Sequence, residues 1–292
     1  MKTLRYRYIL DRLFLSFLVI NTIIVILPLL IMSSYVIVNG ISALNLDLFT
    51  QELGSPTRAM QGQPTGLVHT MAGTLVVDIM ALLFAIPVGL GTGILLSEYP
   101  DHILNPVLRI MNDTLNGMPA VLKGLLAFVL IVKPMGTFSG ISGSAALAIV
   151  MLPIIARSTE SALSIIPWSI REAGLALGLP RWRVVLSAIV PAARTGLITG
   201  FLIAFSRAAG EAAPLLFTSF GNNYLPKHWT GMFFGPVDTL PQRLYSLAIS
   251  PYEHWHRMGW AAAIVLFGFV VISFVIAHLA SGNNLQKKGN SR

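Results

Sequence analysis

A charged pair near residue 210 interrupts a long apolar stretch, where an isolated charge is costly. Arg207 lies 13 residues after Arg194, about 20 Å along a helix that crosses an apolar membrane core about 30 Å thick. Glu211 follows four residues later, on the same helix face, and could form an ion pair with Arg207. A guanidinium can also hold an oxyanion through two parallel hydrogen bonds, and it stays charged at any working pH. The spacing therefore indicates either a structural ion pair or a transient contact for a crossing anion.

A polar island of 23 residues, SIREAGLALGLPRWRVVLSAIVP, ends at Pro191. Ser169 and Glu172 stand three apart in the S-x-x-E capping-box arrangement, which predicts a helix that begins directly after the serine. Gly178 fits the left-handed residue that ends a helix, and Pro180 suits the first turn of the next one. We therefore expect two short helices joined by a tight turn, a helical hairpin.

The first helix of this hairpin has one narrow apolar face. It is formed by residues at i, i+3, i+4 and i+7, which are Ile170, Ala173, Gly174 and Leu177. Its central members are too small to keep a partner at a distance, so the face permits close docking.

The composition is that of an integral membrane protein. The chain has 292 residues, of which 54% are hydrophobic and 11% are charged. Its mean hydropathy is +0.73, far from that of an ordinary soluble domain. It contains no cysteine, which excludes disulfides and thiolate metal sites.

Six apolar stretches predict six membrane-spanning helices. They are residues 13–38, 70–96, 118–132, 141–155, 196–217 and 259–279. The third and fourth are shorter than the roughly 20 residues that cross a membrane, so we expect them to extend into flanking polar residues. Residues 97–109 are expected to form a polar connection, and 39–66 and 218–258 to form loops, the first with a short amphipathic piece at 44–49. The chain is thus a short polar N-terminus, 1–12, followed by one membrane domain, 13–292.

The basic residues predict the orientation. Of the 20 lysines and arginines, 14 lie at the two termini, between spans two and three, and in or beside the hairpin region 158–194, whereas five lie on the opposite side. Cytoplasmic segments carry the excess of positive charge, so both termini and the hairpin are expected in the cytoplasm. The net charge of +8 is thereby explained without nucleic acid.

Several other chemistries are excluded. Gly89, Gly91 and Gly93 lack the spacing of a phosphate-binding loop and fit a helix-packing face. The six histidines are scattered, and His254 and His256 lack metal-site spacing. A DNA-binding helix-turn-helix does not fit, because the second hairpin helix leads into a membrane span and presents no polar side chains for base edges. No ATP-binding motif is present, so ATP-driven transport would need another chain.

The hairpin resembles a known family motif. Glu172, Ala173, Gly174, Gly178 and Pro191 are similar to the EAA loop of ABC importer permeases, whose pattern is E-A-A-x-x-x-G followed by nine residues and I-x-L-P. Here a glycine stands for the second alanine, and alanine and valine stand for the isoleucine and leucine before the proline. These are small changes at apolar positions, and the glutamate and the glycine are kept.

Four further stretches resemble phosphate permeases of the PstA type, and the resemblance covers almost the whole chain. They are GISALNLDLFTQ at 40–51, AIPVGLGTGILLSEY at 85–99, FSRAAGEAAPLLFTSFGNN at 205–223 and LPQRLYSLAISPYEHW at 240–255. One departure is NGMPAVLK at 116–123, where the family more usually carries an uncharged run, so Lys123 is unexpected.

The resemblance implies an all-α integral membrane protein with the six transmembrane helices of the type I ABC importer permease fold and both termini cytoplasmic. It implies a phosphate permease subunit in a bacterial or archaeal cytoplasmic membrane. The expected partners are a homologous PstC-like permease, two copies of a PstB-like ATPase, an external PstS-like phosphate-binding protein and membrane lipid, but no nucleic acid. The chain itself is expected to be no enzyme and to bind no cofactor or metal, because ATP and magnesium belong to the ATPase.

The same resemblance assigns the coupling residues. The helix that sits in a groove of the ATPase falls on Arg171–Gly178, with Glu172 and Gly178 as its signature positions. The full coupling set is Arg171, Glu172, Ala173, Gly174, Gly178 and Pro191.

The substrate pathway is assigned in the same way. The family places an arginine and a glutamate at the positions of Arg207 and Glu211, and another arginine at Arg157. We expect Arg207 to hold the anion and Glu211 to keep that contact from becoming too tight. Arg157 and Lys123 are expected to serve nearer the cytoplasm.

Three alternatives remain at this stage. A permease for another oxyanion, such as molybdate or sulfate, would share the architecture. A secondary anion carrier would also carry charges within the membrane. A mainly sensory role in phosphate signalling is the third.

Overall fold

The computed structural model describes residues 2–55, 57, 61 and 63–289. Met1, Arg58 and Arg292 belong to the predicted N-terminal segment, the first predicted loop and the C-terminus, and they lie outside the described residues. The described part is helical, without named strands, and has one isolated β-bridge between Phe220 and Val237.

Four helices are long and apolar enough to cross a membrane individually. They are α1 (Lys2–Ile41), α4 (Val68–Glu98), α8 (Gly140–Ser164) and α16 (Glu253–Gly289). Each contains one of the six predicted spans. Two further spans are present if each of two bent helix pairs is one span, which gives up to six.

The first bent pair contains the third predicted span. Helix α5 (Asn105–Gly117) meets the segment Ala120–Met135 at 113°. This segment consists of α6 (Ala120–Ala127), a π-helical stretch η1 (Phe128–Val132) and α7 (Lys133–Met135). The expectation of a polar connection up to residue 109 was wrong, because α5 begins at Asn105. An amphipathic helix has too little net hydropathy to be recognised as a span from its apolar content.

The second bent pair corrects the fifth predicted span. Helix α12 (Arg194–Ala209) follows the segment Arg181–Ala192 at 74° and ends well before residue 217. After Gly210 the chain forms only a single short turn, α13 (Ala213–Leu216). Pro214 lacks a backbone N–H and cannot continue the hydrogen bonding of α12, which explains the break.

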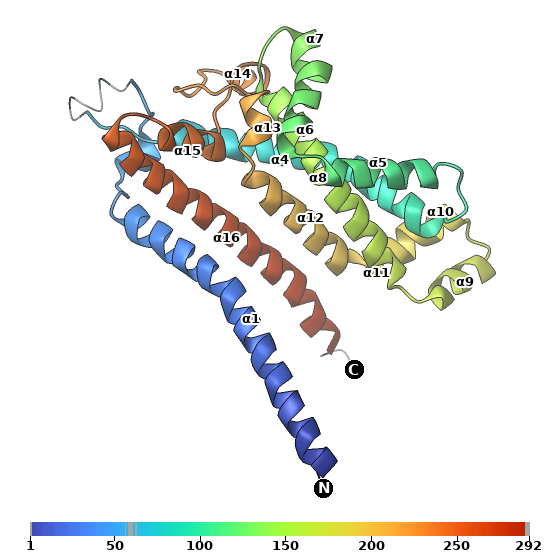
Figure 1. Ribbon diagram of the computed structural model, residues 1–292. Coiled ribbons are helices and arrows are strands. Elements are labelled where there is room, and N and C mark those ends of the chain that lie inside the picture. Colours follow the sequence, from blue (N-terminus) through green and yellow to red (C-terminus); the bar gives the residue numbers. More distant parts are fainter. Residues whose placement is uncertain (1, 56, 58–60, 62, 290–292) are drawn as a thin grey trace.

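The remaining helices are short. They are α2 (Asp47–Thr50), α9 (Trp168–Ala176), α10 (Arg181–Val184), π-helical η2 (Val185–Ile189), α11 (Val190–Ala192), α14 (Trp229–Phe234) and α15 (Leu240–Ala248). In Figure 1 the start of α1, the end of α16 and the hairpin of α9 and α10 lie toward the bottom and right, whereas α14 and α15 lie toward the top and left.

Helices α4 and α8 form the centre of the fold, packed against α12. A Cβ atom on Gly89 would come within 2.6 Å of Ile155 Cγ2, and one on Gly93 within 2.4 Å of Thr159 Cβ. Backbones can approach this closely only where side chains are absent, so the prediction of a glycine packing face is confirmed for Gly89 and Gly93. It is wrong for Gly91, whose Cβ would meet no atom within 4 Å.

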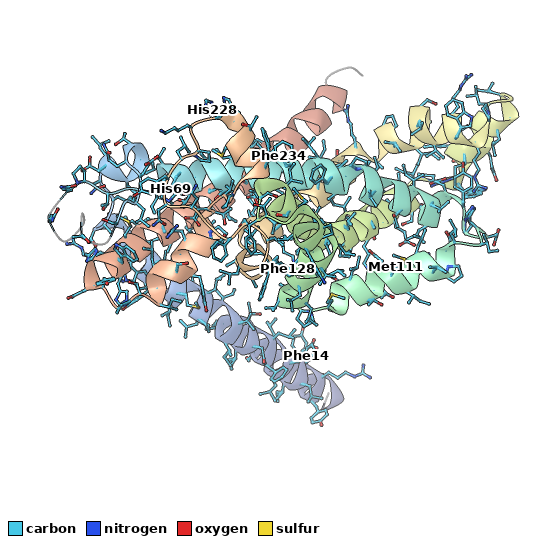
Figure 2. The ribbon with its side chains drawn as sticks, turned by 90° about the horizontal axis from the view of Figure 1, so that it is seen from above. Phe14, His69, Met111, Phe128, His228 and Phe234 are labelled. Carbon is cyan, nitrogen blue, oxygen red and sulfur yellow. The ribbon has the colours of Figure 1, made fainter. Side chains whose placement is uncertain are left out.

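Helix α1 lies at the edge of the molecule, beside α16 (Figure 1). Tyr35 and Trp260 make an edge-to-face contact between them, with ring centroids 5.2 Å apart. Most apolar side chains of α1 are exposed, and Phe14 lies on the part of α1 that extends away from the other helices (Figure 2). Such a surface suits lipid or a partner chain.

Candidate functional site

The first hairpin helix, α9, begins earlier than the sequence predicted. It starts at Trp168 after Pro167, and no side chain caps its first turn. The predicted capping box of Ser169 and Glu172 was therefore wrong, because the serine is already inside the helix and its hydroxyl no longer faces the free N–H groups. Glu172 is exposed instead.

The turn that ends α9 is the one predicted. Gly178 has a φ of +77°, in the left-handed region. Its N–H donates to Leu175 O at 2.9 Å, and the N–H of Leu179 donates to Gly174 O at 3.3 Å. These two bonds are those of a Schellman motif, which satisfies the last carbonyls of the helix.

The small apolar face of α9 is partly used within the hairpin. A Cβ on Gly174 would lie 2.7 Å from Val184 Cγ2 in α10, so Gly174 lets the two hairpin helices approach each other. Ala173 is exposed, and 80% of Leu177 is exposed. The surface left for a partner therefore comprises Glu172, Ala173 and Leu177 together with the turn at Gly178. Pro191 lies farther on, exposed, in α11.

Arg171 faces the interior, away from any surface a partner could contact. Only 6% of it is exposed, and its Nε and Nη2 donate to the two carboxylate oxygens of Glu98 at 2.9 Å and 2.5 Å. The prediction that placed Arg171 in the coupling surface is thus corrected, because its side chain is buried against Glu98 and does not lie on that surface. Glu98 was not predicted, and its signal in the sequence is a carboxylate at the last position of a membrane-length apolar run.

The structure brings together three of the four predicted pathway residues. Arg207 Nη2 lies 3.6 Å from Glu211 Oε1, and 59% of the arginine side chain is exposed against 21% for the glutamate. Lys123 lies in α6, which packs against α13 shortly after the end of α12, and only 4% of this lysine is exposed. Helix α6 reaches this position because Gly124 lies directly against Pro214 of α13.

The broken helix explains how Arg207 is held at this depth. Arg207 is in the last turn of α12, where the free carbonyls of the helix end favour a positive charge. Helices that stop within a membrane protein, and expose backbone there, recur at transport sites. A half-exposed guanidinium beside a carboxylate and a lysine can bind an oxyanion reversibly, since its free N–H groups remain available.

Arg157, the fourth predicted pathway residue, lies in a different ion-pair group. It pairs with Asp113 of α5, and Arg109 of α5 donates to Glu160 at 2.7 Å. Both pairs line a cavity of about 210 Å³ between α4, α5 and α8. The partners of Arg157 were missed because α5 was not recognised as a helix.

A second polar cluster, at the other end of α4, was also missed. Asp238 pairs with Arg243, which donates to Asn223 Oδ1 at 2.7 Å, and His69 Nε2 of α4 lies 3.5 Å from Asp238 Oδ2. His69 lies among the helices at this end of the fold (Figure 2). In the described part of the chain, no three histidine, aspartate or glutamate side chains are grouped to hold a metal ion.

Comparison with protein families gives one match. Residues 85–282 match the family described as binding-protein-dependent transport system inner membrane component.

Curated relatives extend the similarity over most of the chain. The phosphate transport system permease protein PstA of Xylella fastidiosa is 37% identical over 235 residues, which cover 80% of this chain and 79% of that protein. The corresponding protein of Pasteurella multocida is 33% identical and covers 83% of this chain and 84% of its own length. A probable PstA of Methanocaldococcus jannaschii is 31% identical over 92% of both chains.

Solved structures with the same fold have low sequence identity. A chain of the methionine ABC transporter MetNI, in an inward-facing conformation, is 19% identical and superposes with a TM-score of 0.59 over 80% of this chain and 99% of that one. A chain of an amino acid ABC transporter is 16% identical, with a TM-score of 0.55 over 74% of this chain and 92% of that one.

Proposed function

The chain belongs to the family of binding-protein-dependent transport system inner membrane components, and on that basis we propose that it is the membrane-spanning permease subunit of an ATP-driven phosphate importer. The observation that carries this proposal is the similarity to PstA proteins along most of the chain, at 31% to 37% identity. The helix arrangement of ABC importer permeases supports the same conclusion.

A permease of this family works with an ATPase and an external binding protein. For this chain the partners are a homologous PstC-like permease, two copies of a PstB-like ATPase and a PstS-like phosphate-binding protein. ATP and magnesium bind to the ATPase, so this subunit supplies the path and the coupling surface and no catalytic residue.

The membrane topology has six spans, with each bent helix pair counted as one. One domain, 13–292, follows the N-terminal segment 1–12, and both termini and the coupling loop at about 158–194 lie in the cytoplasm. The distribution of basic residues, 14 against five, supports this orientation. The location is the cytoplasmic membrane of a bacterium or archaeon.

The ATPase contacts the hairpin through its exposed residues. Glu172, Ala173, Leu177 and Gly178 form the contact, while Gly174 and Arg171 keep the hairpin in shape. Pro191 lies one residue before the end of the segment Arg181–Ala192, where the chain bends by 74° into α12.

Phosphate passes the group of Arg207, Glu211 and Lys123. Arg207 offers two N–H groups to phosphate oxygens, and Glu211 competes for the same guanidinium, which keeps the contact short-lived. Lys123 adds positive charge nearby, which offsets part of the cost of bringing the anion out of water. Arg157, beside the 210 Å³ cavity, contacts the anion nearer the cytoplasm.

Phosphate uptake by the reconstituted complex tests the proposal. Proteoliposomes that contain all four components should take up labelled phosphate only when ATP is present on the side of the membrane where the ATPase is bound. Uptake driven by a proton gradient without ATP would instead identify a secondary carrier. Competition by sulfate or molybdate stronger than by unlabelled phosphate would identify a different oxyanion.

A further inference from the structure

Two consecutive residues at the end of α4 each hold one arm of the hairpin. Glu98 binds Arg171 of α9 through both carboxylate oxygens. Tyr99 lies under the guanidinium of Arg181 of α10, 4.7 Å from ring centroid to Cζ. The hairpin is therefore attached to α4 by a buried ion pair on one arm and by a cation–π contact on the other.

Arg171 donates four hydrogen bonds, which fix the direction of its side chain. Besides the two bonds to Glu98, Arg171 donates to Leu163 O at 3.0 Å and to Ile166 O at 2.7 Å. The planar guanidinium therefore joins α9 both to the end of α4 and to the chain that leaves α8. A bidentate pair of this kind holds an angle as well as a distance, which an apolar contact does not.

The second arm of the hairpin also packs on α8 and α12 through a buried apolar cluster that includes Leu163, Val184 and Leu197. A cavity of about 90 Å³ lies beside the pair, lined by Glu98, Arg171, Trp168 and side chains of α10 and η2. On the first arm, α9, the attachment to α4 is the ion pair itself.

The opposite end of α4 is attached to the segment around residue 238. His69 approaches Asp238, and Thr74 Oγ1 accepts the N–H of Leu240 at 2.8 Å. Gly73 lies so close to this segment that an added Cβ would be 1.9 Å from Asp238 O. Helix α4 spans 31 residues, about 46 Å at 1.5 Å per residue, and so connects the two ends of the molecule directly.

We propose that Glu98 and Arg171 are positioning residues that transmit movement of α4 to the coupling hairpin, and so couple docking of the phosphate-loaded binding protein to the ATPase. This inference rests on the proposed function. It assigns a coupling role to a pair of residues that does not itself touch the ATPase or the anion.

The test compares variants of the complete reconstituted complex. The single change Glu98→Gln leaves the buried guanidinium without its carboxylate and can prevent folding. The double change Glu98→Gln with Arg171→Met removes the unpaired charge and keeps similar volumes, so it is the informative variant. Asp101→Asn, an exposed carboxylate three residues after Glu98, is the matched control.

Three quantities are measured: the amount of ATPase that co-purifies, the stimulation of ATP hydrolysis by phosphate-loaded binding protein, and phosphate transported per ATP hydrolysed. In the double variant the ATPase should remain bound, while stimulation falls at least ~5-fold, the lower end of typical coupling between sites. The number of phosphates per ATP should fall as well. The Asp101→Asn control should match the unchanged protein in all three.

Either of two results would overturn the inference. One is wild-type stimulation and transport ratio in the double variant. The other is reduced assembly in which each assembled complex keeps the wild-type ratio, as expected of a pair that serves folding only. Uptake of another oxyanion in preference to phosphate by the unchanged complex would contradict the proposed substrate. Stimulation of ATP hydrolysis by the binding protein loaded with that oxyanion would still test the pair.

Discussion

Arg207 and Glu211 are 3.6 Å apart at the interrupted end of α12, yet more than half of the arginine side chain is exposed. An ion pair that served only the packing of this chain would be expected to lie between its own helices, but they leave most of this arginine side chain uncovered. The open geometry leaves N–H groups of the guanidinium free. This relationship favours an anion contact over a purely structural pair.

Arg207→Gln should reduce phosphate uptake ~10–100-fold, since a charge-assisted contact worth about 1.5–3 kcal/mol is lost. The complex should still assemble and bind its ATPase. Uptake by proteoliposomes that contain equal amounts of complex is the measurement, with the exposed Arg12→Gln on α1 as the control. The double variant with Glu211→Gln separates the two interpretations: recovery of uptake would show that the pair is structural, whereas an anion contact stays lost.

Gly178→Leu should weaken ATPase docking while the permease remains in the membrane. The left-handed φ of +77° strains a leucine, by about 1–2 kcal/mol, and distorts the turn that carries the coupling surface. Space is not the cause, because a Cβ at this position meets no atom within 4 Å. Co-purification of the ATPase measures the effect. Asparagine tolerates the same backbone conformation, so the Gly178→Asn variant should bind the ATPase much better than the leucine variant. Equal loss of ATPase binding in both variants would contradict this account.

Gly93→Ala should destabilise the protein by about 1–3 kcal/mol, the usual cost of overpacking. The added Cβ would lie 2.4 Å from Thr159 Cβ, so α4 and α8 would have to separate. Gly91→Ala, two residues away on the same helix, is the control: nothing lies within 4 Å of its Cβ, and alanine should stabilise the helix by up to about 1 kcal/mol. Thermal unfolding in detergent compares them, and equal melting temperatures would show that this helix contact is not tight.

Single cysteines in this cysteine-free chain test the orientation. Ile165 and Trp229 are both largely exposed, in the hairpin region and in α14. A membrane-impermeant thiol reagent should label Trp229→Cys in intact cells, but Ile165→Cys only after permeabilisation. Labelling of both from outside, or the reverse pattern, would refute the cytoplasmic hairpin.

The sequence alone determined the features that depend on local chemistry. Apolar runs identified the membrane class and the helices α1, α4, α8 and α16, because transfer into lipid depends on the residues of one segment. Gly178 was identified as the end of α9 for a similar reason, since the left-handed conformation is a property of that residue. Arg207 and Glu211 could be paired because residues that are four positions apart in a helix lie on the same face.

Tertiary structure decided the rest. Ser169 lost its predicted cap because the helix begins directly after Pro167, and α5 was hidden by its amphipathic composition. Arg171 binds Glu98, which lies 73 residues earlier in the sequence. Lys123 lies near Arg207 and Glu211 although it belongs to another helix. Hydropathy and residue spacing indicate which segments can lie in a membrane and which residues can form a turn. Which charged side chains pair with one another depends on how helices that are distant in the sequence pack. This packing is determined only when the whole chain folds.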